Sequence, residues 1–217
     1  MNLTEKLNHI VDLGADWVLW LLAALSLIGV AVVIERALFF LTTREDLDEL
    51  RGTVLASLGK GEMIQARNLL EESPSLEAHI VAAGIVAAGI DGADASSATE
   101  CMSSEALRVR VEMERNLTFL GTVGNNAPLV GLLGTVIGVM GAFQELSLST
   151  GQVTEGLMSE VGVALVTTAV GIVVAVPAVA AFNMFQRIVR ARLARADALG
   201  KDVVARLRQL DRARQGA

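Results

Sequence analysis

Two long stretches in the C-terminal half of the chain contain no ionisable residue, and they constrain the fold more than any other feature. Residues 116–144 and 161–186 lack Asp, Glu, Lys, Arg and His altogether. As helices rising about 1.5 Å per residue they would be roughly 43 and 39 Å long, whereas the hydrocarbon core of a bilayer is about 30 Å thick. We therefore expect two transmembrane helices, at residues 117–143 and 161–186.

A third apolar stretch near the N-terminus predicts another transmembrane helix. Residues 18–34 carry no charge, and Trp17 and Trp20 stand at the entrance, where aromatic side chains mark a membrane interface. A secretory signal peptide would need a basic leader and a small-residue cleavage site, but the leader has a single Lys and three acids. We expect a span at 17–41, in agreement with a composition that is 53% hydrophobic.

The distribution of basic residues predicts the orientation of the three spans. Nine of the eighteen Lys and Arg residues fall at or after Arg187, and none lies between 116 and 186. Cationic flanks stay in the cytoplasm, which places the C-terminus inside and the N-terminus outside. The predicted order is a periplasmic segment 1–16, span 17–41, a cytoplasmic helical domain 42–116, span 117–143, a periplasmic loop 144–160, span 161–186 and a cytoplasmic C-terminal helix 187–217.

Nothing in the sequence indicates an enzyme, a metal site or a cofactor. The single Cys101 forms no internal disulfide, and the two isolated residues His9 and His79 have no metal-ligand spacing. The sequence contains no Walker loop or dinucleotide-binding glycine motif, and its glycines are expected inside apolar helices rather than after a strand. We expect no catalysis, no metal and no bound cofactor.

The segment between the first two spans reads as helical throughout. Turn signals divide its first part into three short helices, and from about Ser96 one unbroken helix is predicted to run into the second span. In the tail, apolar residues repeat at spacings of four and three from Val189 to Leu210. This seam predicts packing either on helices of the same subunit or against another subunit.

Small residues form a stripe along each of the last two spans. The stripes consist of Gly121, Gly124, Pro128, Gly131, Thr135, Gly138 and Ala142, and of Ala164, Thr168, Gly171, Ala175 and Ala178. Such faces let helices approach closely, and we expect them to serve helix packing and assembly, together with Gly134. Each stripe carries one hydroxyl near the middle of the membrane, while Thr167 shares a bulkier flank with valines. These hydroxyls either bond back to their own helix or line a hydrated pathway.

Two prolines interrupt the hydrogen bonding of these spans. Pro128 and Pro177 cannot donate to the carbonyls of Gly124 and Val173. Kinks for packing explain most such prolines, but together with two hydroxyls they favour a hydrated or partner-filled channel.

The motifs in these spans resemble the MotA/TolQ/ExbB proton-channel family. They comprise APLVGLLGTVIG at 127–138, ALVTTAVG at 164–171, VPA at 176–178, Phe182-Asn183 and, at the exit of the first span, VIER at 33–36 with Phe39-Phe40. The resemblance follows the whole chain in order. It implies an all-α membrane protein with three transmembrane helices and long cytoplasmic helical extensions, assembled as a pentamer.

The same resemblance implies function, partners and location. The pentamer would surround two single-span helices of an ExbD, TolR or MotB type whose intramembrane Asp titrates, with Thr135, Thr168 and Thr167 lining the proton pathway. The expected protein is a stator of an inner-membrane motor, driven by the proton gradient, that energises TonB-dependent transport, the Tol-Pal system or related machinery through a TonB, TolA or gliding-type partner. A gliding-motility motor of the same family and a non-conducting scaffold are the alternatives.

One position departs from the family pattern. Where these proteins carry a Glu five residues before the second Thr, this chain has Val163, and the nearest acid is Glu160. Glu160, Glu35 and Arg36 are candidate charges at the mouths of the pathway. A secondary transporter is disfavoured, because the spans show neither an inverted repeat nor a charge.

Overall fold

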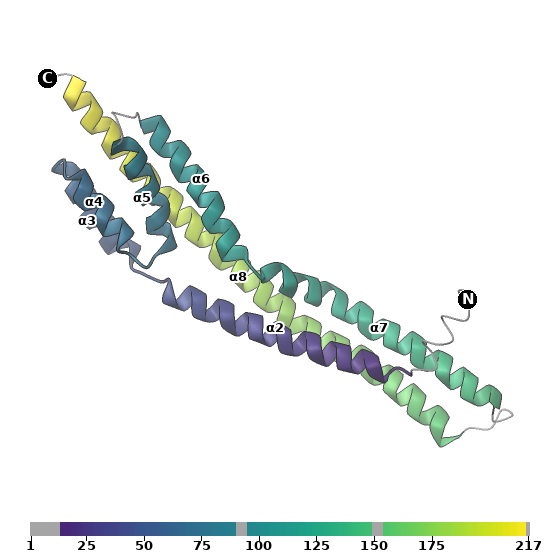
Figure 1. The fold of residues 1–217 in the computed structure, drawn as a ribbon. Helices are drawn as coiled ribbons and strands as arrows, with labels where there is room; N and C mark the ends of the chain where they lie inside the picture. Colours follow the sequence, from purple (N-terminus) through teal and green to yellow (C-terminus); the bar gives the residue numbers. More distant parts are fainter. Residues whose placement is uncertain (1–13, 90–94, 149–153, 216–217) are drawn as a thin grey trace. The chain divides into compact units, whose positions relative to one another are not determined.

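The computed structural model describes residues 14–89, 95–148 and 154–215, and all secondary structure in these ranges is helical (Figure 1). The helices are α2 (Asp16–Thr42), α3 (Leu47–Gly59), α4 (Met63–Glu71), α5 (Leu76–Gly89), α6 (Ala95–Glu114), α7 (Leu117–Leu148) and α8 (Glu155–Gln215). Three of them, α2, α7 and α8, are long and apolar enough to cross a membrane. The predicted fold class, an all-α protein with three such helices, is confirmed.

Two parts of the predicted topology fall partly outside these ranges. Of the predicted N-terminal segment 1–16, the structure describes only residues 14–16. Of the predicted loop 144–160, it describes all but residues 149–153.

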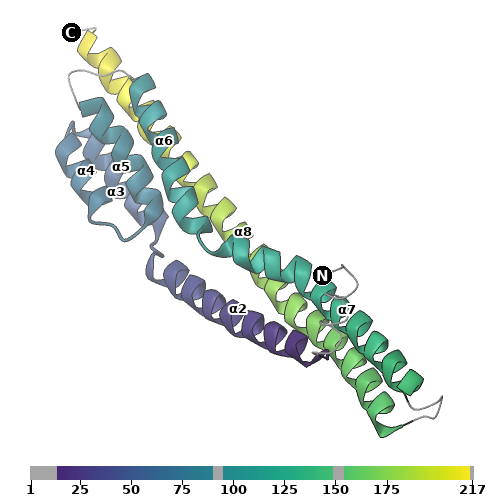
Figure 2. The ribbon, with the colours of Figure 1, turned by 45° about the vertical axis from the view of Figure 1, so that its right-hand side comes forward.

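The chain divides into two compact units. The first, here called the apolar unit, comprises Met1–Glu35 and Asn116–Met184, and the second, called the polar unit, comprises Arg36–Arg115 and Phe185–Ala217. Figure 2 shows the same helices from a second direction. Helices α2 and α8 contribute residues to both units.

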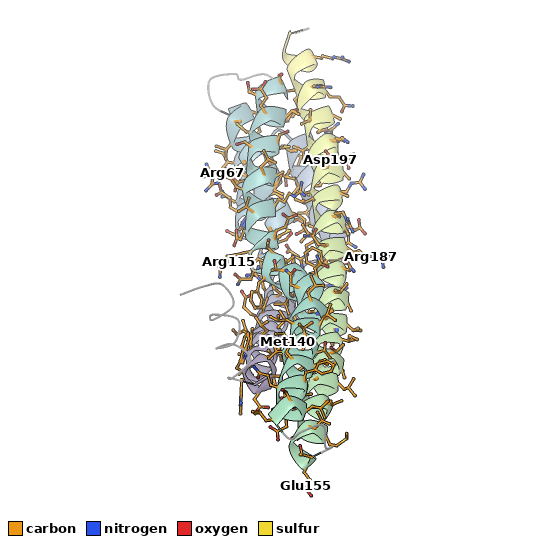
Figure 3. The ribbon with its side chains drawn as sticks, turned by 90° about the vertical axis from the view of Figure 1, so that its right-hand side faces the viewer. Arg67, Arg115, Met140, Glu155, Arg187 and Asp197 are labelled. Atoms are coloured by element: carbon orange, nitrogen blue, oxygen red, sulfur yellow. The ribbon has the colours of Figure 1, made fainter. Side chains whose placement is uncertain are left out.

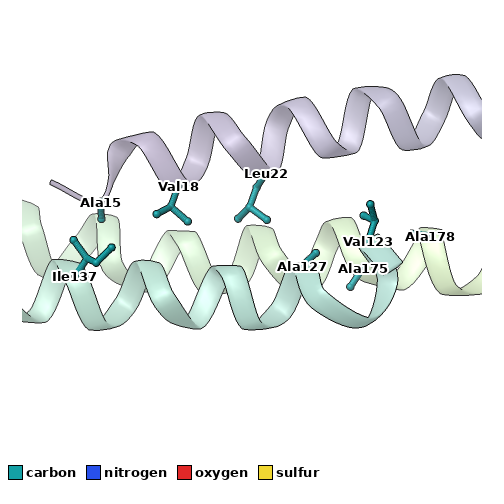
Figure 4. Packing of buried hydrophobic residues seen from close by; sticks show 8 residues of the cluster. All are labelled: Ala15, Val18, Leu22, Val123, Ala127, Ile137, Ala175 and Ala178. Atoms are coloured by element: carbon teal, nitrogen blue, oxygen red, sulfur yellow. The ribbon is translucent and has the colours of Figure 1, made fainter. Parts of the chain in front are cut away.

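In the apolar unit, α2 packs along α7 and α8 through small and branched side chains. Val18 and Leu22 are fully buried and point from α2 toward the other two helices, where Ala127 and Ala175 lie (Figure 4). The opposite face of α2 exposes large apolar side chains, with Trp20 77% and Leu27 74% accessible. Helices with apolar residues on both faces are expected inside a bilayer, where the exposed face meets lipid or a neighbouring helix.

The polar unit packs α3 to α6 against the C-terminal part of α8. Of the seam residues, Val189, Ala196, Val203 and Leu207 are buried in this unit. Arg51 on α3 forms an ion pair of 2.7 Å with Asp202 on α8. The structure therefore shows the first of the two packing alternatives, with the seam covered by helices of the same subunit.

The predicted unbroken helix from Ser96 into the second span is wrong. Helix α6 ends at Glu114 and α7 begins at Leu117, because Asn116 adopts a left-handed backbone conformation with φ of 62°. Asn tolerates this conformation better than most residues, so the chain can break a helix here without Gly or Pro. Its backbone carbonyl accepts a hydrogen bond of 3.2 Å from the Phe119 N–H as α7 starts.

Candidate functional site

The two mid-span hydroxyls meet at the contact between α7 and α8. The Oγ1 atoms of Thr135 on α7 and Thr168 on α8 lie 3.2 Å apart. The Thr168 hydroxyl also lies 3.0 Å from the carbonyl oxygen of Gly131 on the other helix, and the Thr135 hydroxyl lies 2.7 Å from the carbonyl oxygen of Leu132. Both residues are only half-buried, so this hydroxyl pair, Thr135 and Thr168, borders the surface of the apolar unit.

The hydroxyl pair has fewer hydrogens than acceptors. Each hydroxyl donates one hydrogen, whereas the three contacts present the carbonyls of Gly131 and Leu132 and the hydroxyl oxygen of the other Thr. Two hydrogens cannot satisfy three contacts at once, so one contact always lacks its hydrogen. The hydroxyl oxygens keep lone pairs for a donor that approaches from the exposed side.

Glycines bring the two helices close enough for this contact. A Cβ atom at Gly131 would lie 2.8 Å from the carbonyl oxygen of Thr167, and one at Gly171 would lie 2.7 Å from that of Ala127. Real Cβ atoms are essentially never found this close to another heavy atom. The absence of side chains at these two positions therefore sets the separation of α7 and α8 at the level of the hydroxyl pair.

Two further glycines of α7 extend the contact away from this level. A Cβ at Gly134 would come within 2.5 Å of the Thr167 hydroxyl, and one at Gly138 within 2.7 Å of the Ala164 side chain. The small-residue face of α7 is thus occupied by a helix of the same chain.

Thr167 does not share the environment of the other two hydroxyls. Its side chain is completely buried between α7 and α8, and its hydroxyl donates to the carbonyl oxygen of Ala164 at 2.7 Å. This bond back to its own helix satisfies the hydroxyl hydrogen and leaves the side chain to fill space opposite Gly134. Thr167 was predicted on a bulkier flank, whereas the structure places it within the contact.

The two prolines lie inside helices that continue past them. Pro128 is half-buried within α7, and Pro177 is exposed within α8. Pro177 lines an apolar crevice of about 210 Å³ between α2, α7 and α8, together with Gly29, Val173 and Ala178. Among the residues that line this crevice, only Ser26 has a polar side chain.

The three candidate mouth charges occupy different settings. A Cβ at Gly141 would lie 3.3 Å from Oε2 of Glu160, so this carboxylate lies against α7. Glu35, at the other end of the apolar unit, accepts a hydrogen bond of 3.4 Å from the Asn116 side chain. Arg36, in the polar unit, is only 2% exposed.

Arg36 acts as a structural anchor within the polar unit. Its guanidinium donates to the carbonyl oxygen of Glu112 at 3.1 Å and lies 4.9 Å from the centre of the Phe39 ring. The carbonyl belongs to the last turn of α6, where unpaired backbone acceptors favour a cation.

Arg192 is a second buried arginine, and it was not among the site residues predicted from the sequence. It donates to the carbonyl oxygen of Phe40 at 2.7 Å and to the side chain and carbonyl of Thr43 at 2.7 and 3.2 Å, so it caps the end of α2. The buried carboxylate of Glu77 on α5 lies 3.8 Å away. Burial lowers the pKa of Arg192, and the charge of Glu77 opposes this change.

These features define a class of protein. The apolar unit consists of helices long and apolar enough to cross a membrane, with a half-buried pair of hydroxyls at the contact of two of them, and no ionisable residue occurs in residues 116–144 and 161–186, which carry this pair. Among the described residues, no cluster of His, Cys, Asp and Glu could hold a metal ion. The chain belongs to the MotA/TolQ/ExbB proton channel family, whose model matches residues 72–198.

Curated relatives agree with this assignment. An ExbB-like biopolymer transport protein of Helicobacter pylori is 38% identical over 80 residues, which are 37% of this chain and 53% of the relative. The biopolymer transport protein ExbB of Xanthomonas campestris is 38% identical over 96 residues, 44% of this chain and 38% of the relative. The Tol-Pal system protein TolQ of Pseudomonas aeruginosa is 38% identical over 87 residues, 38% of each chain. The chain thus spans about half or less of the length of these relatives.

Proposed function

We propose that this chain is the channel and stator subunit of a proton-driven motor in the bacterial inner membrane, with its N-terminus in the periplasm. The motor energises a partner that acts in the periplasm or at the outer membrane; the relatives are named for biopolymer transport and for the Tol-Pal system. Five copies would surround two partner helices. One proton crossing a potential of 100 mV releases about 2.3 kcal/mol, which is the energy available to each step.

The observation that carries the proposal is a half-buried hydroxyl pair in spans that lack a titrating group. Proton transfer requires a group that changes its protonation state, and hydroxyls of Thr do not do so at physiological pH. Thr135 and Thr168 can accept and donate hydrogen bonds, orient a water or position a carboxyl group. Another chain must therefore supply the titrating group, and the family resemblance implies that this group is an Asp on a single-span partner of the ExbD, TolR or MotB type.

Reconstitution in vesicles tests this division of roles. The chain alone should pass negligible proton current under an imposed potential, and addition of the partner helix should produce a current. Changing the partner's Asp to Asn should abolish that current, because an amide does not exchange a proton in this pH range. Robust proton flux with this chain alone would contradict the proposal and direct attention to Glu160 and Glu35.

A further inference from the structure

The outer surface of the polar unit carries charges of opposite sign on different helices. Between residues 46 and 72, which include α3 and α4, exposed acids outnumber exposed bases by six to three. The acids are Asp46, Asp48, Glu49, Glu62, Glu71 and Glu72, and the bases are Arg51, Lys60 and Arg67. On α8 from Arg187 to Arg208, five exposed bases stand against one exposed acid, Asp197.

Helix α4, which carries part of the acidic surface, lies on a different side of the polar unit from the basic residues of α8. Figure 3 shows Arg67 of α4 at one side of the polar unit and Arg187 and Asp197 of α8 at the other. Charges of α3 are partly paired with α8, as in the ion pair between Arg51 and Asp202, whereas the acidic α4 and the basic side of α8 stay apart. They suit a head-to-tail contact between copies, which closes into a ring when the rotation between neighbours allows it.

The basic side also contains a groove that no part of the described chain fills. It has a volume of about 390 Å³ and lies between α6 and α8, where Met102, Ala196 and Val204 form an apolar floor. The exposed residues Lys201 and Ala205 stand along the α8 side of the groove. An apolar cavity of about 150 Å³ already accepts a benzene-sized molecule, so this groove has room for large aliphatic side chains.

The acidic side presents one large apolar side chain. Ile64 on α4 is 78% exposed, one turn from Arg67 and two turns from Glu71 on the same helical face. A single exposed aliphatic residue is common on protein surfaces and has no meaning alone. Here Glu62, Glu71 and Glu72 lie at the ends of the same short helix, and Lys201 and Arg208 line the groove on the other side of the unit.

We infer that Ile64 of one copy inserts into the groove between α6 and α8 of the next copy, and that the acidic and basic surfaces flank this contact. The occupant of the groove is thus a second copy of the same chain. The inference rests on the homo-oligomer of the proposed function and specifies one of its subunit contacts.

Cross-linking between two differently tagged, full-length chains tests the contact. Both chains carry Cys101→Ser, which removes the native thiol, and one carries Ile64→Cys while the other carries Ala205→Cys. Co-expression followed by oxidation should yield a disulfide-linked pair that contains both tags. Either chain expressed alone should remain unlinked, because a head-to-tail contact never places the same residue opposite itself. A chain with Ile64→Cys and Ala205→Cys together should produce a ladder of linked species.

Native mass spectrometry of the same preparations separates the two possible failures. An intact oligomer without the mixed disulfide, or one in which Ile64→Cys links to itself, would overturn the inferred contact and leave the proposed assembly in place. A monomer in mild detergent would overturn both. As a matched control, Leu107→Cys, which is also strongly exposed in the polar unit but does not line the groove, should not link to Ala205→Cys.

Discussion

Replacement of Gly171 by Ala should destabilise the apolar unit, although Ala favours helices more than Gly does. The added Cβ would lie 2.7 Å from the carbonyl oxygen of Ala127 and 3.1 Å from the Cα atom of Gly131. Both neighbours are backbone atoms of α7, so no side chain can rotate away to relieve the overlap. The two helices would have to separate along their contact.

Gly162 provides a matched control on the same helix. A Cβ at this position would meet no atom within 4 Å, so Gly162→Ala changes helix propensity without changing packing. Ala is favoured over Gly in a helix by about 0.8–1 kcal/mol, and this gain is common to both variants. Overpacking costs about 1–3 kcal/mol, and the free energy of unfolding of Gly171→Ala should therefore lie about 1–3 kcal/mol below that of Gly162→Ala.

Equilibrium unfolding in mixed detergent and SDS micelles measures this difference. The fluorescence of Trp17 and Trp20, the two tryptophans of the chain, reports on the first span. Equal stability of the two variants, or a more stable Gly171→Ala, would refute the close contact between α7 and α8. Separation of the helices should also weaken the bond between the Thr168 hydroxyl and the other helix, so proton-driven activity should fall with stability.

Thr168→Val, which keeps the shape but removes the hydroxyl, should preserve assembly while proton-driven activity falls strongly. Thr167→Val, whose hydroxyl bonds only to its own helix, should leave activity near that of the unchanged protein, and equal loss in both variants would count against a role of the hydroxyl pair. Arg192→Met should lower the stability of the polar unit by about 3–5 kcal/mol in chemical denaturation, because it leaves a buried carboxylate without its cation; a cost below about 1 kcal/mol would show that the pair is not buried in solution. In a Cys101→Ser background, Ser159→Cys should react with an impermeant thiol reagent added from the periplasmic side, and Ala205→Cys should not. The reverse pattern would contradict the proposed orientation.

The number and type of spans could be predicted because uncharged length is a property of the sequence alone. The placement of Thr135 and Thr168 on small-residue stripes was equally visible. Their direct contact was not, since it depends on the register with which α7 packs on α8. The same register places Thr167 in the contact, because the interface is wider than one row of small residues.

Two other features show why local signals were insufficient. Asn116 fits an α-helix and a left-handed turn, so a continuous helix and an interrupted one were equally compatible with the sequence. In the sequence, Arg192 is one of nine basic residues at or after Arg187. Its position three residues after Val189 and four before Ala196 places it in the buried row of α8, which was the available signal for a buried arginine.

The shortage of hydrogens at the hydroxyl pair has an electrical consequence. Two O–H bonds that share three contacts can be arranged in more than one way without any movement of the helices. Rotation about the C–O bonds changes which hydroxyl donates to the other, and with it the direction of the local dipole. A carboxylic acid facing this point could donate to the lone pairs of a hydroxyl oxygen, and a carboxylate could accept from a hydroxyl that turns away from its carbonyl partner. The hydroxyl pair is therefore a preorganised polar group in the apolar unit. It can respond to a change of charge nearby by rotation of its hydroxyls, without movement of the helices.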